Sequence, residues 1–326
     1  MKQTQYRNRG KSKLLTLLNT LLAVILALML GATVLAHTLM NRMNRVEMPD
    51  GGDVSNTISV NDGQWDDSSE DLLGQERGIV NILLIGQDER GSVTGKRSDT
   101  MILLTVNKQK KAIVMTSFLR DLYVEIPGYS SNRLNASYAW GGMDLLNRTL
   151  ERNFGIYVDG NVEVDFGQFS NIVDLLGGVT IELRADEAKH INKEIGSSLT
   201  EGRNLLSGKE ALEYVRIRKL DADGDFSRTQ RQRTLINAIL RDVKDGGLVD
   251  LLHLVNDVLP MITTDMSNTE ILGYATALLP LLSGAEITSQ RIPADGAYSY
   301  ASVDGMSVLK PDLEANRQIL RETLGN

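Results

Sequence analysis

The stretch IVNILLIG, residues Ile79–Gly86, decides the fold class of this chain. A short, almost unbroken apolar run of this length predicts a strand that is buried on both faces. A polar loop, Gly86–Arg90, follows at the end of the run, which is where open α/β sheets hold their ligands. We therefore expect the folded domain to begin at Gly78, with this run as its first buried strand.

Apolar runs of strand length alternate with segments of helical periodicity along the rest of the chain. Strands are predicted at Thr100–Asn107, Ala112–Ser117, Val179–Leu183 and Glu286–Ile292, and helices at Met143–Phe154, Phe166–Leu176, Leu248–Pro260, Asn268–Leu282 and after Pro311. Such alternation predicts an α/β fold, an αβα sandwich with a mixed central β-sheet. We place the core at residues 78–245 and regard 246–326 as a C-terminal elaboration packed on the same domain.

The N-terminal region predicts one transmembrane helix. Residues 14–36 form an uncharged run of 23 residues, enough to span about 30 Å of hydrocarbon. The basic residues before it place residues 1–13 in the cytoplasm as a short tail, and the remainder outside. A cleaved signal peptide is the alternative, but its apolar region is usually only about 7–15 residues. We expect a single-pass protein of the cell membrane with an extracytoplasmic catalytic domain.

Composition excludes several classes of function. Residues 37–77 are acidic and polar, which predicts an extracytoplasmic stalk whose acidic run at 66–71 is a solvating spacer. The chain has a formal net charge of −7 although its first 13 residues carry five positive charges, so we expect no nucleic-acid partner. It has no cysteine and only three histidines, which excludes thiol chemistry and argues against a histidine-based zinc site.

Five arginines fall between Tyr214 and Arg233: Arg216, Arg218, Arg228, Arg231 and Arg233. Residues 214–218 are predicted to be the end of a helix that runs into an extended segment, with Ser207 and Glu210 as the capping box of that helix. Alternation along the extended segment places Arg216 and Arg218 on the same side.

A second helix is predicted to begin near Ser227, its N-cap. Arg228 and Gln232 are four residues apart and share a face with the apolar stripe of this helix, so both point toward the core. Inward-facing arginines at a helix N-terminus suit a bound anion. Internal pairing of the arginines is the alternative, with Asp221, Asp223 or Asp225 as partners.

Two aspartates lie at the ends of predicted strands. Asp88 lies after the first strand and Asp99 opens the second, so they meet at one edge of the sheet if these strands are neighbours. Two carboxylates beside guanidinium groups suit one Mg²⁺ that bridges to a phosphate, although each alone is typical of a cap or turn. Arg120 follows the third strand, and Asn135 either binds a phosphate oxygen or holds its own loop.

Seven segments in this order closely resemble the LytR-CpsA-Psr family of membrane-anchored wall-polymer ligases. They are NILLIGQDER (81–90), KRSDTMILLTV (96–106), SFLRDLYVEIPG (117–128), RLNASYAWGG (133–142), VDFGQFSNIVDLLGGV (164–179), LLSGKEALEYVRIRK (205–219) and DFSRTQRQ (225–232). The resemblance implies an apolar pocket for a polyprenyl chain. It also implies Mg²⁺-dependent transfer of a glycopolymer from an undecaprenyl-pyrophosphate carrier to peptidoglycan, with teichoic acid, capsule or another anionic glycan as the polymer.

The resemblance also assigns roles to individual residues. It implies metal binding by Asp88 and Asp99, catalytic roles for Asp99, Arg120 and Arg228, and pyrophosphate binding by Arg97, Arg120, Arg216, Arg218, Arg228 and Gln232. Two positions depart from the family pattern, Leu119 where proline is usual and Arg133 where lysine is commoner. Hydrolysis of the lipid pyrophosphate is one alternative activity, and a non-catalytic envelope receptor or transcriptional attenuator is another.

The lipid requires an apolar lining. Candidate lining residues are Phe166, Phe169, Ile172, Val173 and Leu176 on one helical face, together with Leu145, Leu146 and Leu150. For each of them ordinary core packing is the alternative, because any amphipathic helix carries such a stripe. The general base of the reaction stays unassigned.

Overall fold

The computed structural model describes residues 37–48, 78–88, 97–221, 223–245, 257–274 and 285–324. The chain divides into two compact units, residues 1–42 and 43–326, and residues 37–40 of the first form a helical turn. Within the described ranges no helix is both long enough and apolar enough to cross a membrane. The predicted tail 1–13, the transmembrane helix 14–36 and most of the stalk lie outside these ranges.

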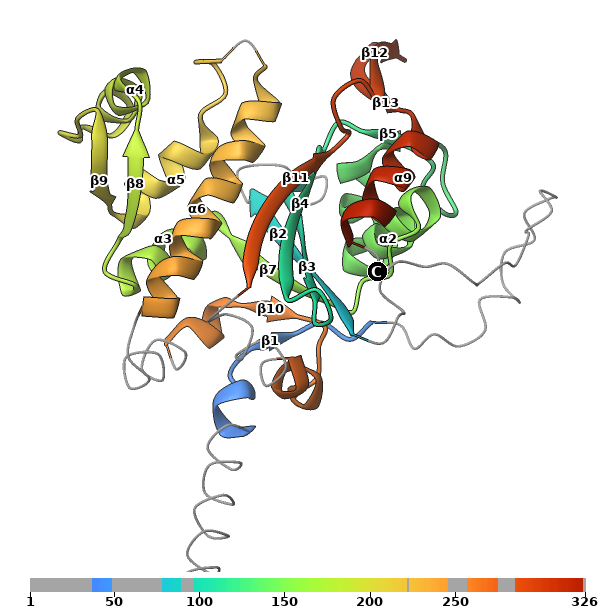
Figure 1. Ribbon diagram of the computed structural model, residues 1–326, viewed down its shortest axis with the longest axis horizontal. Helices are drawn as coiled ribbons and strands as arrows, with labels where there is room; N and C mark the ends of the chain where they lie inside the picture. Colours follow the sequence, from blue (N-terminus) through green and yellow to red (C-terminus); the bar gives the residue numbers. More distant parts are fainter. Residues whose placement is uncertain are drawn as a thin grey trace, which may run out of the picture. The chain divides into compact units, whose positions relative to one another are not determined.

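A mixed sheet of seven strands forms the centre of the second unit (Figure 1). Its order is β1 (Asn44–Arg45), β10 (Thr263–Thr264), β7 (Gly160–Asp165), β2 (Ile79–Asp88), β3 (Arg97–Asn107), β4 (Ala112–Phe118) and β11 (Glu286–Ile292). β2 runs antiparallel to β3 and parallel to β7, and β4 runs antiparallel to β3 and parallel to β11. The predicted mixed central sheet is confirmed, and β1 comes from the segment expected to be a stalk.

The run at 79–86 forms most of β2, beside β3 in the middle of the sheet. Leu83 and its partner Leu103 are fully buried on one face, whereas Leu84 points to the opposite face and lines a cavity there. Both faces of the strand are therefore covered, which is why its sequence is apolar at almost every position.

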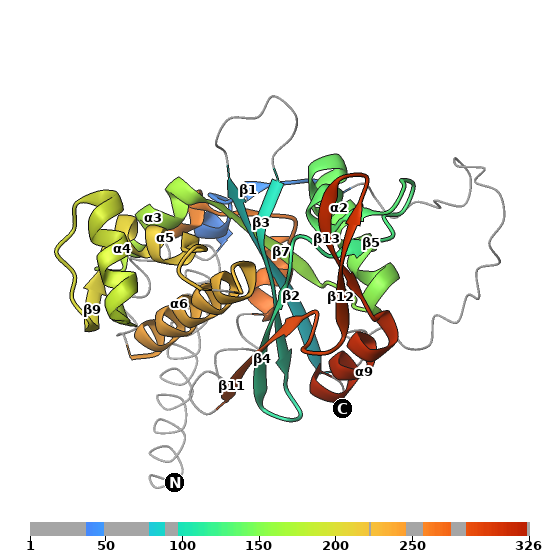
Figure 2. The ribbon, with the colours of Figure 1, turned by 90° about the horizontal axis from the view of Figure 1, so that it is seen from above.

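One face of the sheet is covered by α2 (Leu134–Phe154) and α9 (Leu313–Leu324), and Figures 1 and 2 show both helices on that side. Leu146, Leu150, Leu320 and Leu324 belong to the same buried cluster as residues of β2, β3 and β4. The sequence predicted the first helix only from Met143, but it begins nine residues earlier. Gly141 and Gly142 have non-helical dihedral angles and kink it, which hides the continuous helix from a search for periodicity.

The opposite face is covered by α3 (Phe166–Leu175), α5 (Gly208–Arg216) and α6 (Asp225–Asp245) (Figures 1 and 2). Outside them lie the hairpin of β8 (Val179–Leu183) and β9 (Gly202–Leu206), and α4 (Ala185–Ile195). These elements share a second buried cluster that includes Val173, Ile191 and Leu235. The layers are helix, sheet and helix, as predicted.

Helix ends were predicted with mixed success. The main-chain N–H and hydroxyl of Ser207 both donate to Glu210 at 2.8 Å, which confirms the capping box of α5. The prediction of Ser227 as the N-cap of α6 was wrong, because the helix already includes Asp225. Ser227 therefore lies in the first turn, one residue before Arg228.

The C-terminal segment contributes to both the sheet and its covering layers. β11 extends the central sheet beside β4, and the hairpin of β12 (Tyr298–Val303) and β13 (Met306–Pro311) follows it. Smaller elements are β5 (Tyr123–Val124), β6 (Asn132–Arg133) and the 3₁₀ turn η2 (Leu259–Met261), and residues 268–274 are helical. The remainder of the helices predicted at 248–260 and 268–282 lies outside the described residues.

Candidate functional site: an arginine cluster beside an apolar cavity

Three arginines from different elements meet at Asp99 in β3. Arg120, just after β4, donates from Nη1 to Asp99 Oδ1 at 2.7 Å, and Arg218 Nη2, after α5, lies 3.5 Å from Asp99 Oδ2. Arg228, in the first turn of α6, donates from Nη2 to the main-chain oxygen of Asp99 at 3.3 Å. The structure thus brings together four of the residues that the sequence assigned to the site.

Asp225 is a second carboxylate of this cluster, and the sequence analysis did not assign it to the site. Its Oδ2 accepts hydrogen bonds from Arg120 Nε at 3.2 Å and from Arg228 Nη2 at 3.1 Å, and its Oδ1 lies 3.6 Å from Arg218 Nε. The sequence feature that could have indicated this pairing is the position of Asp225, three residues before Arg228 on the same face of α6. For Asp225 the alternative of internal pairing is correct.

Burial and pairing act against each other in the cluster. Burial raises the pKa of Asp225 above its usual value, even though the charges of Arg120 and Arg218 oppose this shift. Burial alone would lower the pKa of Arg120, but Asp225 and Asp99 outweigh it and raise that pKa. Arg120 therefore stays charged. For Asp225, the attraction of the neighbouring arginines only partly offsets the loss of hydration that burial causes.

Arg228 retains unused hydrogen-bonding capacity. Its side chain is 3% exposed, and its Nε and Nη1 atoms are buried with no hydrogen-bond partner. Asp121 adds a third carboxylate, 3.7 Å from Arg120 Nε, but it also faces Arg133. Among the described residues, four guanidinium groups thus face three carboxylates. A buried cation with orphaned donors is typical of a site whose anionic ligand comes from outside.

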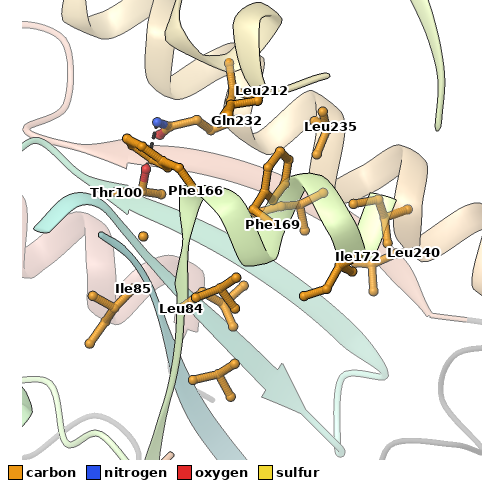
Figure 3. Close-up of a pocket in the computed structure, with 16 residues that line it drawn as sticks. Leu84, Ile85, Thr100, Phe166, Phe169, Ile172, Leu212, Gln232, Leu235 and Leu240 are labelled. Carbon is orange, nitrogen blue, oxygen red and sulfur yellow. Dashed lines mark hydrogen bonds between the residues drawn. The ribbon is translucent and has the colours of Figure 1, made fainter. Parts of the chain in front are cut away.

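Gln232 and Arg216 connect the cluster to the neighbouring cavity. Gln232 Nε2 donates to Thr100 Oγ1 at 2.8 Å, and Figure 3 shows this bond at the edge of the cavity. The Arg216 guanidinium carbon lies 4.2 Å from the centre of the Phe166 ring, and Phe166 itself lines the cavity. Both residues therefore lie at the boundary between the arginine cluster and the apolar lining.

The cavity lies between α3, α6 and the sheet and has a volume of about 240 Å³. Phe166, Phe169 and Ile172 line it, as predicted, together with Leu212 and Leu240 (Figure 3). Its lining was only partly predicted, since it also includes Leu84, Val162, Val164, Val215, Leu235, Ile236 and Ile239.

Several candidate lining residues lie elsewhere. Leu145, Leu146 and Leu150 are fully or almost fully buried on α2, on the opposite face of the sheet, so for these three candidates the alternative of ordinary core packing is correct. Val173 packs in the cluster beneath β8 and does not line the cavity. Leu176, the C-cap residue of α3, does not line it either.

The structure describes the main chain, but not the side chains, of Asp88 and Arg97, and it places Asn135 beside Arg120. Asp88 and Arg97 are backbone partners at the end of the β2–β3 hairpin, which confirms that these strands are neighbours, but their side chains lie outside the described set. The described residues contain no group of three or more acidic, histidine or cysteine side chains that could hold a metal ion. The main-chain N–H of Asn135 donates to the Arg120 carbonyl oxygen at 3.2 Å and so supports the loop that carries Arg120.

Arg231 belongs to a separate ion-pair network. Its Nε donates to Glu187 Oε1 at 2.7 Å, both side chains are about 95% buried, and its Nη2 binds Asp221. For Arg231 the alternative of internal pairing is correct. This arginine fixes α6 against α4 and the segment after α5.

Comparison with known proteins matches this chain to one family model and to several sequence relatives. The sequence model described as the LytR_cpsA_psr family matches residues 43–323. The polyisoprenyl-teichoic acid–peptidoglycan teichoic acid transferase TagU of Oceanobacillus iheyensis is 36% identical over 218 residues, 63% of this chain and 66% of that protein. The regulatory protein MsrR of Staphylococcus aureus is 31% identical over 253 residues, 76% of this chain and 75% of that protein.

Solved structures agree with these sequence relatives. TagT bound to LIIa-WTA matches with a TM-score of 0.63 and 30% identity, over 77% of this chain and 92% of that one. A structure of TagT with bound octaprenyl pyrophosphate lipid matches with a TM-score of 0.59 and 28% identity over the same shares. Because the family model matches residues 43–323 and the fold agrees with these solved structures, this chain belongs to the LytR-CpsA-Psr family.

Proposed function

We propose that this protein is a glycopolymer transferase. It moves an anionic glycopolymer from an undecaprenyl-pyrophosphate carrier to a hydroxyl group of peptidoglycan and releases undecaprenyl phosphate. The observation that carries the proposal is the meeting of Arg120, Arg218 and Arg228 beside an apolar cavity. Relatives named as teichoic acid transferases and a related structure with a polyprenyl pyrophosphate support it.

The two halves of the site match the two halves of such a donor. Guanidinium groups bind phosphate oxygens in pairs of parallel hydrogen bonds, and the orphaned Nε and Nη1 atoms of Arg228 supply donors for this purpose. The cavity beside Gln232 offers an apolar lining to a polyprenyl chain. A diphosphate therefore displaces Asp99 and Asp225 from the arginines when it binds.

The reaction follows from the position of the charges. The peptidoglycan hydroxyl oxygen attacks the phosphorus next to the sugar, and the bond from that phosphorus to the bridging oxygen breaks. The bridging oxygen and its electron pair leave with undecaprenyl phosphate, and the hydroxyl proton passes to a base that we leave unassigned. Arg120, Arg218 and Arg228 stabilise the negative charge that develops on the phosphate oxygens.

Mg²⁺ is part of this proposal. Protein sites for Mg²⁺ commonly supply one or two carboxylates and take the remaining ligands from substrate phosphates and water. Asp99 fits as one ligand because both of its oxygens face the cluster, and we assign Asp88 as the second. When bound, the ion neutralises charge on the phosphates.

The membrane anchor at 14–36 and an extracytoplasmic location are also part of the proposal, because the lipid carrier lies in the membrane. The polymer is an anionic glycan of the cell wall. Pyrophosphate linkages of this kind are common to several such polymers, so the arginine cluster recognises the linkage that they share.

Incubation of the full-length chain in detergent with a synthetic undecaprenyl-pyrophosphate glycan and peptidoglycan oligomers tests the proposal. Mass spectrometry should detect a Mg²⁺-dependent phosphodiester product with the wild type. Arg228→Ala should abolish the product, whereas Arg241→Ala, at an exposed position on the same helix, should not. An intact donor with the wild type, despite measurable donor binding, would favour the non-catalytic receptor.

A further inference from the structure

Arg233 is a buried cation that makes no contact with the two aspartates of the arginine cluster among the contacts of the described residues. Its residue is 3% exposed, and its Nε and Nη1 atoms are buried with no hydrogen-bond partner. Its Nη2 donates to Gln230 Oε1 at 2.6 Å, and no carboxylate among the described residues forms an ion pair with it. An unpaired buried guanidinium is costly, because nothing in the protein replaces its lost water.

A second arginine and an orphaned hydroxyl lie under this part of α6. Arg291 of β11 pairs in register with Ser117 of β4, and the next pair, Ile292 and Phe118, lies in the core on the α2 and α9 side. Since side chains alternate along strands, Ser117 and Arg291 point to the face that α6 covers. The Ser117 Oγ atom is also buried without a hydrogen-bond partner.

The charge of Arg291 increases the need for an anion. Its guanidinium carbon lies 4.4 Å from the centre of the Phe226 ring, and its carboxylate partner, Asp295, is 90% exposed. Burial, and then the charge of Arg291, lower the pKa of Arg233 to about 10. Arg233 is therefore still charged at neutral pH, beside a cation whose own counter-ion is in water.

This position differs from the pyrophosphate site. Arg228 and Gln232 contact Asp99 and Thr100 on β3. Arg233 lies seven residues, or about two turns, after Phe226 on α6. The Phe226 ring contacts Arg291 of β11, two strands farther along the sheet. Five residues along a helix correspond to a rotation of about 140°, so Arg228 and Arg233 cannot point in the same direction. α6 therefore separates two groups of cationic side chains.

We propose that Arg233, Arg291 and Ser117 form a second anion site, which takes a tetrahedral oxyanion of the phosphate class. The unpartnered Nε and Nη1 atoms of Arg233 and the Ser117 hydroxyl provide donors for such an ion. Arg291 adds positive charge, because its Nη1 already donates to the Pro293 carbonyl oxygen at 2.8 Å and its Nη2 to Asp295. The ion is a phosphate group of the donor's own polymer or free phosphate. The first of these sources rests on the proposed function, whereas the site itself does not.

Phosphate titrations of thermal unfolding separate the two sites when they are performed on the full-length chain in detergent. In Arg228→Met, where the pyrophosphate site is weakened, phosphate should still raise the Tm. The double variant Arg228→Met/Arg233→Met should respond more weakly, with a Kd for phosphate at least about tenfold higher. Adding Arg241→Met, at an exposed position on the same helix, should leave it unchanged. If Arg228→Met alone removes the response, or Arg233→Met leaves it intact, the proposal is overturned.

Crystals grown with selenate test the position directly, even if a variant does not fold. We expect an anomalous peak between the Arg233 guanidinium and Ser117 Oγ, and its loss in Arg291→Met. A peak confined to the surroundings of Arg228, with water beside Arg233, would contradict the proposal.

Two donors distinguish the sources of the phosphate. With a donor whose glycan contains phosphodiesters, Arg233→Met should raise KM about tenfold and leave kcat unchanged, and a neutral glycan of equal length should show no effect. Equal KM values with retained phosphate binding would assign the site to free phosphate and overturn the polymer as its source. No transfer with either donor would refute the proposed function while the titration and the selenate peak still decide this site.

Discussion

Arg120 and Asp225 are 105 residues apart in sequence, yet Arg120 Nε donates to Asp225 Oδ2 at 3.2 Å. Through this bond the loop after β4 is held against the first turn of α6. Asp225 also binds Arg228, so one carboxylate occupies donors that a substrate phosphate needs. Asp99 and Asp225 thus occupy part of the arginine donors, and an anion must compete with them.

Removal of the Asp225 charge should therefore strengthen anion binding. Asp225→Asn keeps the shape of the side chain but removes the competing charge, so its Kd for inorganic pyrophosphate should fall about tenfold. Isothermal titration calorimetry without Mg²⁺ measures this directly. Weaker binding by Asp225→Asn would show instead that the carboxylate is needed to position the arginines.

The same carboxylate predicts a dependence on pH. Because burial raises the pKa of Asp225, this group takes up its proton at a higher pH than an ordinary aspartate. Affinity for sulfate, whose own charge is constant in this range, should therefore increase as the pH falls from 7 toward 5. The change should be smaller in Asp225→Asn, and equal pH profiles for the two proteins would refute the assignment.

The pair of Arg231 and Glu187 should contribute to stability and not to anion binding. Both side chains are about 95% buried and lie 2.7 Å apart. Removal of one partner of a buried pair commonly costs about 3–5 kcal/mol. Urea unfolding of Arg231→Met should show a loss of this size, and the double variant Arg231→Met/Glu187→Met should lose less than the sum of the two single variants. A loss below about 1 kcal/mol would contradict the assignment, since that is the range of exposed pairs.

The cavity should determine affinity for the lipid but not for the diphosphate. Ile236 lines the cavity on α6, and tryptophan at this position fills part of its volume. Ile236→Trp should raise the Kd for a long-chain polyprenyl pyrophosphate about tenfold and leave that for inorganic pyrophosphate unchanged. Leu205→Trp, at a position 64% exposed, is the matched control. Equal lipid affinities for the two variants would place the polyprenyl chain elsewhere.

Strong local patterns made the centre of the fold predictable. The run at 79–86 is apolar because it is buried on both faces, so its conformation and its burial follow from composition. The β12–β13 hairpin was missed although Asp304 and Gly305 carry the Asp-Gly turn signal, and both have positive φ angles. Most side chains in its strands are half-buried or exposed, so no apolar alternation marks the strands themselves.

The site was predicted in part, and the omissions have a physical reason. Arg228 and Gln232 were found because a cation and an amide directed toward a core at a helix N-terminus imply an anionic ligand. Arg218 was found from the clustering of arginines, and Arg120 from its place after a strand and from the family resemblance. Asp225 was interpreted only as a possible neutralising partner, since a sequence cannot show that one carboxylate serves arginines from three elements. Whether Leu145 and its helix neighbours line the cavity or pack in the core was left open, because an amphipathic stripe does not reveal which face of the sheet it covers.

The fate of the phosphate oxygens tests the central claim most directly. The full-length chain is incubated in H₂¹⁸O with the lipid-pyrophosphate glycan, peptidoglycan oligomers and Mg²⁺. The masses of the products are then measured by mass spectrometry. The proposed transfer predicts a peptidoglycan-linked phosphodiester and undecaprenyl phosphate, both without ¹⁸O. Free glycan phosphate that contains one ¹⁸O would instead show that water is the acceptor and that the protein is a hydrolase.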